Sequence, residues 1–365
     1  MADLPLLEKM DSRLSFKQQF ERVLLIGEAW RGAGILDSNP VQSGCPHHTY
    51  LTLQWGNPNS RRNIDLDENV LDNLQPPKCL KNLSIDQYMA ARFAIWMNNV
   101  NKIFNLEKIK LTECLECETL LPFGQLPFLK SLYLHNMPKL KELPSLPSKL
   151  KRLEIDGIGW TTLNFCSNSN PIPLESLGVF HCPNITSLPL ADEIRRLAAL
   201  RYLSIITNCP NLISRGRYRE VETTNNCHLM LSNLWISDPS VLLIEPLRSI
   251  FSLKELSISL SDELVSFPNE AEEWFLNITS SLCKLNYIHL ASLQSLPSSE
   301  SLSSLQELYI EDVPMLRELP NLPPSLKRLI IIGDCHPELK KRYREDGGSD
   351  RHKIAHIPQY DIRPR

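Results

Sequence analysis

Apolar residues recur along the chain in the pattern L-x-x-L-x-L, in which Ile or Val replaces some of the Leu residues. Eleven copies start, on average, about 25 residues apart. They cover residues 80–85, 106–111, 129–134, 150–155, 174–179, 200–205, 231–236, 253–258, 285–290, 305–310 and 326–331. The last two apolar positions of each copy are two residues apart, so in an extended strand they point to the same side. Each copy therefore predicts a β-strand, and the weaker block 48–53 predicts one more strand before them.

A single copy cannot bury its apolar side alone, but stacked copies form a continuous core. The spacing lies within the ~20–29 residues of leucine-rich repeats. Leu-Pro steps such as Leu143-Pro and Leu319-Pro fall between the copies, where Pro blocks strand or helix continuation. The predicted fold class is an α/β repeat solenoid. We expect a leucine-rich-repeat horseshoe with a parallel sheet on the concave side and irregular or short helical turns on the convex side.

The repeats set the expected organisation of the chain. We assign residues 46–335 to the leucine-rich-repeat array and residues 336–365 to a polar C-terminal cap or tail. Residues 1–45 match neither the repeat nor any motif and stay unassigned.

Composition and charge exclude several classes of function. The net charge of −3 gives no general attraction to nucleic acid or to an anionic membrane, so we expect neither as a partner. No apolar run approaches the ~18 residues of a membrane span. The N-terminus has early acidic residues and no apolar segment typical of a secretory signal. We therefore expect ten reduced cysteines and a cytoplasmic location, with a nuclear one also open.

Several segments resemble a particular family. Val70-Leu-Asp-Asn-Leu-Gln-Pro-Pro, Leu121-Pro-Phe-Gly-Gln-Leu-Pro and the tail Cys335-His-Pro-Glu-Leu-Lys-Lys-Arg carry the resemblance. They resemble the repeat region of plant coiled-coil nucleotide-binding leucine-rich-repeat disease-resistance proteins, of the type found in grasses. The resemblance implies a recognition module of plant innate immunity that senses a pathogen effector or a host protein modified by one. It also implies a regulatory contact with a nucleotide-binding (NB-ARC) switch domain, in cis or in trans.

The sequence departs from that family in one respect. No G-x-x-x-x-G-K-[ST] loop is present to hold phosphates, so we expect the switch to come from another polypeptide. Two alternatives stay open, an extracellular leucine-rich-repeat receptor ectodomain and an intracellular substrate-adaptor scaffold. The first is supported by the glycosylation sequons at Asn82, Asn184 and Asn277.

The outward residues of the predicted strands form the candidate protein-binding site. They include aromatic and charged side chains, and Trp, Tyr and Arg are the usual anchors of protein interfaces. The competing interpretation is a solvated sheet surface on which aromatic residues merely favour the strand conformation. The candidate residues on the concave face are Tyr133, Arg152, Glu154, Phe180, Tyr202, Trp235, Tyr287, His289, Tyr309 and Arg328.

Other motifs indicate structure more than chemistry. Cys114 and Cys117 form a C-x-x-C pair, but no two further ligands follow at the spacing that a zinc site needs. Cys114 and Cys182 fall where leucine-rich repeats place a buried Asn or Cys after the strand. The nine His residues are scattered and match no H-E-x-x-H motif, and G-x-S-x-G is absent. We expect no enzyme activity, no cofactor and no metal.

Overall fold

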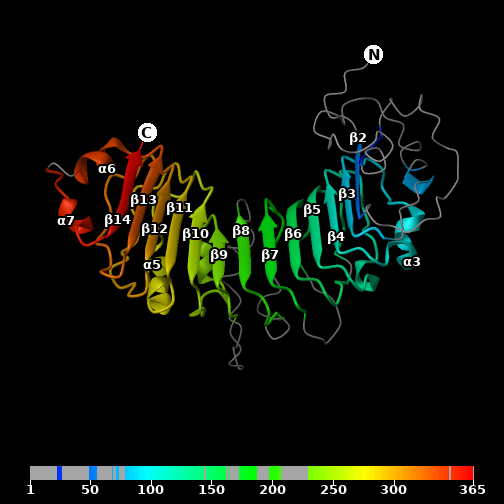
Figure 1. Ribbon diagram of the computed structural model, residues 1–365, viewed down its shortest axis with the longest axis horizontal. Helices are drawn as coiled ribbons and strands as arrows, with labels where there is room; N and C mark the ends of the chain where they lie inside the picture. The colour runs from blue at the N-terminus through cyan, green and yellow to red at the C-terminus, as the bar shows by residue number, and fades with distance from the viewer. Residues whose placement is uncertain are drawn as a thin grey trace, which may run out of the picture. The chain divides into compact units, whose positions relative to one another are not determined.

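The computed structural model describes residues 23–26, 49–55, 68, 71–73, 79–143, 145–161, 163, 172–186, 197–206, 229–344 and 347–364. The chain forms two compact units, residues 1–160 and residues 161–365. Both units are built from short parallel strands joined by return segments with one-turn helices (Figure 1). None of the helices in the described residues has the length and apolar character that a membrane crossing requires.

The sheet of the first unit pairs its strands in chain order, each parallel to the next. Its strands are β1 (Val23–Ile26), β2 (Tyr50–Trp55), β3 (Asn82–Asp86), β4 (Lys108–Thr112), β5 (Ser131–Met137) and β6 (Arg152–Ile158). The return segments contain η3 (Ile95–Asn98), α3 (Val100–Ile103) and η4 (Phe123–Gln125).

The second unit repeats this arrangement. Its strands are β7 (Ser176–Phe180), β8 (Tyr202–Ile206), β9 (Asn233–Ile236), β10 (Glu255–Ser259), β11 (Lys284–Ile288), β12 (Glu307–Glu311), β13 (Arg328–Gly333) and β14 (Gln359–Pro364). Its helices are η5 (Pro239–Leu243), α5 (Asn269–Trp274), η6 (Phe275–Ile278), α6 (Pro337–Arg342) and α7 (Arg351–Ile354).

The strands are aligned so that equivalent apolar residues lie side by side. Leu234 of β9 pairs with Leu256 of β10, which pairs with Leu285 of β11. All three are at most 1% exposed, because the second and fourth residues of the strands from β2 to β13 point into the core. The α/β leucine-rich-repeat solenoid with a parallel sheet, predicted from the sequence, is confirmed, and so is the strand expected near residue 50.

A left-handed residue follows many of these strands at the same place, directly after the fifth strand position. Non-glycine examples include Glu113 (φ 53°), Leu260 (φ 57°) and His289 (φ 52°). In β6 and β13 the equivalent sixth position is a glycine, Gly157 (φ 61°) and Gly333 (φ 77°) respectively. Glycine has no Cβ and adopts this conformation without strain. The repeated turn directs the chain from the sheet into the return segment.

One predicted strand is wrong in its register. The block 285–290 was expected to place Tyr287 and His289 outward. The structure instead pairs Leu256 with Leu285 and Ile258 with Tyr287, so that the apolar positions are Leu282, Leu285 and Tyr287. Tyr287 is 1% exposed, and its ring contacts Phe267 edge-on, with a centroid separation of 6.0 Å. His289 is exposed but lies in the turn after β11, beside Asp312. The error arises because Tyr fills a position that Leu or Ile fills in most other repeats.

The segment after residue 335 is tied to the last repeats. β14 pairs in parallel with β13, which adds one more strand to the sheet. The Tyr343 hydroxyl accepts a hydrogen bond from the Leu319 backbone N–H at 2.9 Å, and Lys353 Nζ donates to the Leu319 carbonyl at 3.1 Å. The segment 336–364 therefore covers the end of the core and is more than a polar tail.

Candidate protein-binding face of the sheet

The candidate site is the sheet face, which we define as the side chains at the first, third and fifth positions of each strand. These positions alternate with the buried leucines, so strand geometry alone turns them away from the core. The strands themselves stay close together, so side chains at equivalent positions of neighbouring strands are in contact although some 20–30 residues separate them in sequence.

In the first unit the sheet face is organised around Tyr133 on β5. Lys108 Nζ of β4 lies over the Tyr133 ring, 4.8 Å from its centroid. Arg152 Nη1 of β6 lies 3.5 Å from the Tyr133 hydroxyl oxygen. The ring is half-buried between these two cations, and a cation over an aromatic face is attracted by its quadrupole. The result is an aromatic side chain held upright on the sheet, which is the state that an interface anchor needs.

A histidine between two carboxylates lies next to Tyr133. His135 Nε2 is 3.3 Å from Glu154 Oε1, and His135 Nδ1 is 3.7 Å from Asp156 Oδ2. The hydrogen bond from His135 lowers the pKa of the Glu154 carboxyl below its ordinary value of 4.5. Because the folded pKa of Glu154 is depressed, the stability that this contact contributes is lost as the pH falls through that pKa.

In the second unit a hydrogen-bonded group surrounds Trp235 on β9. The Trp235 indole N–H donates to the Ser259 hydroxyl, while 42% of the residue stays exposed. The Glu255 carboxylate accepts from Asn233 Nδ2 at 2.8 Å and from Asn286 Nδ2 at 3.1 Å. These bonds link β9, β10 and β11 side by side. Trp235 thus presents a broad apolar surface from a position that its neighbours fix.

A second aromatic residue of this unit, Tyr309 on β12, is oriented in the same way. Its hydroxyl donates to Glu311 Oε2 at 2.7 Å. Burial, and next this hydrogen bond, raise the pKa of Tyr309 to about 12, so the hydroxyl stays a donor at physiological pH. Glu307 lies 4.0 Å from Lys284 Nζ and 3.8 Å from Arg328 Nη1, which balances the charge around the ring.

The structure places most of the predicted site residues on the sheet face, but in two groups. The first unit carries Tyr133, Arg152 and Glu154, and the second carries Phe180, Tyr202, Trp235, Tyr309 and Arg328. Tyr287 faces the core and His289 lies in a turn, as described above. Whether any of these residues binds a partner stays a prediction.

Sequence reasoning missed several members of the face, among them His135, Asp156 and Asn286. His135 and Asp156 occupy the fifth strand position, beyond the last apolar residue of the repeat. Extending the alternation by one more step would have found them. Asn286 was missed because the predicted register of β11 was wrong.

The cysteines of the C-x-x-C pair are structural. Cys114 and Cys117 are fully buried, and Cys117 Sγ donates to the Ala90 carbonyl in the neighbouring return segment at 3.2 Å. The hydrogen bond with Cys114, and next burial, raise the pKa of the Cys117 thiol, which keeps it protonated. The described residues contain no group of three or more His, Cys, Asp or Glu arranged to hold a metal ion.

Comparison with known proteins identifies the repeat type. Residues 46–137 match a family model described as R13L1/DRL21 LRRs. The chain is 30% identical over 229 residues to a putative disease resistance protein, RGA1, of Solanum bulbocastanum. The aligned segment covers 60% of this chain and 21% of that protein. The chain carries leucine-rich repeats like those of plant disease resistance proteins.

Two further relatives agree with this assignment. The putative disease resistance RPP13-like protein 1 of Arabidopsis thaliana is 26% identical over 309 residues, or 76% of this chain and 25% of that protein. The TMV resistance protein N of Nicotiana glutinosa is 28% identical over 256 residues, or 62% of this chain and 21% of that protein. This leucine-rich-repeat chain therefore spans about a fifth to a quarter of the length of these relatives. The resemblance noted in the sequence is confirmed for the repeat region.

Proposed function

We propose that this leucine-rich-repeat chain is a protein-recognition module of plant innate immunity. Its sheet face binds a pathogen effector or a host protein that an effector has modified. The observation that carries the proposal is the set of aromatic side chains, Tyr133, Trp235 and Tyr309, each held by hydrogen bonds or cations on an exposed sheet. The names of the relatives supply the biological setting.

A protein partner fits this surface better than a small molecule. The side chains form rows along successive strands, and a ligand must be extended to touch several of them. Small-molecule sites are concave pockets of about 300–1,000 Å³ that enclose their ligand. Trp, Tyr and Arg dominate the binding energy of protein interfaces, and all three occur on the face.

The test replaces both aromatic anchors of the second unit. Trp235→Ala with Tyr309→Ala removes exposed rings without touching the core. A matched control, Phe104→Ala with Met315→Ala, removes side chains that are 44% and 41% exposed but lie outside the strands. Both variants and the unaltered chain are expressed in pathogen-challenged leaf as fusions to a proximity-labelling enzyme.

The expected result is a set of proteins labelled by the unaltered chain and the control but lost with the face variant. A single substitution of an interface anchor often weakens binding by more than about tenfold. Identical labelling by all three proteins would rule out the face as the recognition surface.

We also propose a regulatory contact with a nucleotide-binding switch domain, in cytoplasm or nucleus. The switch domain can be part of the same polypeptide or of another one. Immunoblotting of source tissue with an antibody against residues 229–344 distinguishes these two arrangements. A band at 41.8 kDa places the switch on another polypeptide. A band several times larger places it in the same one. Failure of this chain to co-precipitate a nucleotide-binding domain in either arrangement would exclude the contact.

A further inference from the structure

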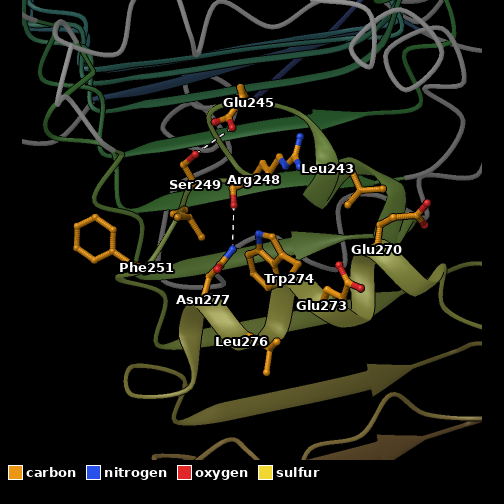
Figure 2. Close-up of a pocket in the computed structure, with 11 residues that line it drawn as sticks. Leu243, Glu245, Arg248, Ser249, Phe251, Glu270, Glu273, Trp274, Leu276 and Asn277 are labelled. Atoms are coloured by element: carbon orange, nitrogen blue, oxygen red, sulfur yellow. Dashed lines mark hydrogen bonds between the residues drawn. The ribbon is translucent and has the colours of Figure 1, made fainter. Parts of the chain in front are cut away.

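A groove opens between two consecutive return segments of the second unit, away from the sheet face. One wall is η5 with the chain that follows it to Phe251, and the other is α5 with η6 (Figure 2). The groove has a volume of about 740 Å³, several times the ~150 Å³ that accepts a benzene-sized group. We call it the return groove.

Hydrogen bonds between the two walls hold the return groove in shape. The Trp274 indole N–H donates to the Leu247 carbonyl at 2.9 Å, and Asn277 Nδ2 donates to the Arg248 carbonyl at 3.2 Å. Trp274 is only 3% exposed, so its ring is part of the core while its edge closes the groove. Because its walls are already ordered, a preformed groove binds a ligand without an additional loss of conformational entropy.

The rim of the return groove carries apolar side chains that the fold does not bury. Leu276 is 61% exposed, one of the most exposed large apolar side chains in the described chain, and Phe251 is 47% exposed. Figure 2 shows Leu276 on the same wall as Asn277 and Trp274, whereas Phe251 lies on the opposite wall with Ser249. Exposed apolar side chains at the edge of a groove are typical of protein-interaction sites.

The charges around the return groove are mainly negative. Glu270 and Glu273 project from α5, and Glu245 lies on the opposite wall, where it accepts a hydrogen bond from the Ser249 hydroxyl at 2.9 Å. Within the described residues no Lys, Arg or His lies within 4.0 Å of these three carboxylates. Arg248 is the single basic residue among those that line the groove. The carboxylates are therefore available to a cation supplied by a ligand.

We propose that the return groove binds a protein segment that carries an apolar side chain flanked by Lys or Arg. The apolar side chain covers Leu276, which is the more exposed of the two, and the flanking cations face Glu245, Glu270 and Glu273. Charge complementarity selects a basic segment over an acidic one, since like charges across an interface cost free energy. This second docking site does not depend on the sheet face, and the partner that it takes need not be the one recognised there.

The probe is a short fluorescein-labelled peptide of Leu, Lys and Ala with the Leu residues on one helical face. Its two controls replace every Lys by Glu, or every Leu by Ser. Fluorescence anisotropy is measured as the full chain is added. We expect saturable binding of the Leu–Lys peptide, and at least about tenfold weaker binding of both controls. Equal binding of the acidic peptide, or no binding of the Leu–Lys peptide, would overturn the proposal.

Matched variants locate the binding on the chain. Glu270→Lys with Glu273→Lys should weaken binding by about tenfold or more, whereas Glu142→Lys with Glu263→Lys changes net charge equally, outside the groove, and should not. Leu276→Ser should also weaken binding, and Ile95→Ser, at a residue that is 68% exposed in the first unit, should not. Equal losses in a variant and its control would show nonspecific attraction and overturn the assignment.

A third comparison separates this site from the proposed recognition surface. Trp235→Ala with Tyr309→Ala should leave peptide binding unchanged, because neither residue lines the return groove. Loss of peptide binding in that variant would place the peptide on the sheet face and contradict the proposed groove.

Discussion

At the residue scale, Tyr287 has an environment unlike that of any other tyrosine on these strands. Its ring occupies a core position of β11, and burial raises the pKa of its hydroxyl above the ordinary value. The hydroxyl has no hydrogen-bond partner among the residues that the structure describes. Tyr309, on the neighbouring strand β12 and opposite Asn286, has a hydroxyl that donates to Glu311. The two residues therefore form a natural comparison.

We predict that Tyr287→Phe raises the free energy of unfolding by up to about 1 kcal/mol, because a buried polar group without a partner costs free energy. Tyr309→Phe removes a made hydrogen bond and should lower the free energy of unfolding by up to about 1 kcal/mol. Urea denaturation followed by circular dichroism measures both. A clear loss of stability in Tyr287→Phe would mean that its hydroxyl is hydrogen-bonded after all.

At the scale of the element, the strands could be predicted from the sequence almost completely, because alternation with period two is a local property. β1 was missed within the unassigned residues 1–45, and β14 was missed because Tyr360 and Ile362 take the positions that leucines mark in the repeat. The register of β11 was wrong for a related reason, since two overlapping readings of residues 282–290 fit the pattern. Contacts such as His135 with Glu154 could not be predicted, because they depend on the exact alignment of two strands.

The turn after each strand gives an element-scale prediction. Gly157→Ala should lower the free energy of unfolding by about 1 kcal/mol, because an L-residue is strained at positive φ. The new Cβ would lie 3.4 Å from Asn136 Cα, an ordinary contact, so strain and not a clash is the cause. Asn136→Gly, at the equivalent sixth position of β5, is the control in the opposite direction. Equal stability of all three proteins in urea would contradict a strained turn.

At the scale of the whole molecule, each of the two units is a row of repeats in which neighbouring strands pack side by side. In such arrays a local defect weakens the adjacent repeats most, and its effect decays along the row. The fold class was predictable because the same signal occurs eleven times, so a misread copy does not change the conclusion. For the candidate site, the sequence could predict only that it lies on the outward side of the strands. The grouping of its side chains around Tyr133 and Trp235 depends on how neighbouring strands are aligned with each other.

We predict that Leu132→Asp and Leu256→Asp have effects centred on different units. Each buries a charge at a fully buried position, in β5 and β10 respectively, and should cost several kcal/mol. Fluorine NMR of 5-fluorotryptophan in urea reads Trp96 in the first unit and Trp274 in the second. Leu132→Asp should lower the midpoint at Trp96 more, and Leu256→Asp the midpoint at Trp274. Equal shifts at both probes would show that the chain unfolds as one cooperative body.

The alternation of core and face along each strand also has an evolutionary consequence. A mutation at a second or fourth position is removed by selection for folding, whereas one at an exposed first or third position alters mainly what the surface can touch. Under the proposed function, selection imposed by a changing pathogen can therefore act on the face while the leucines stay fixed. Sequence variation among natural alleles of this chain should accordingly concentrate at the outward positions of its strands, and the identity of only 26–30% to relatives is compatible with such divergence.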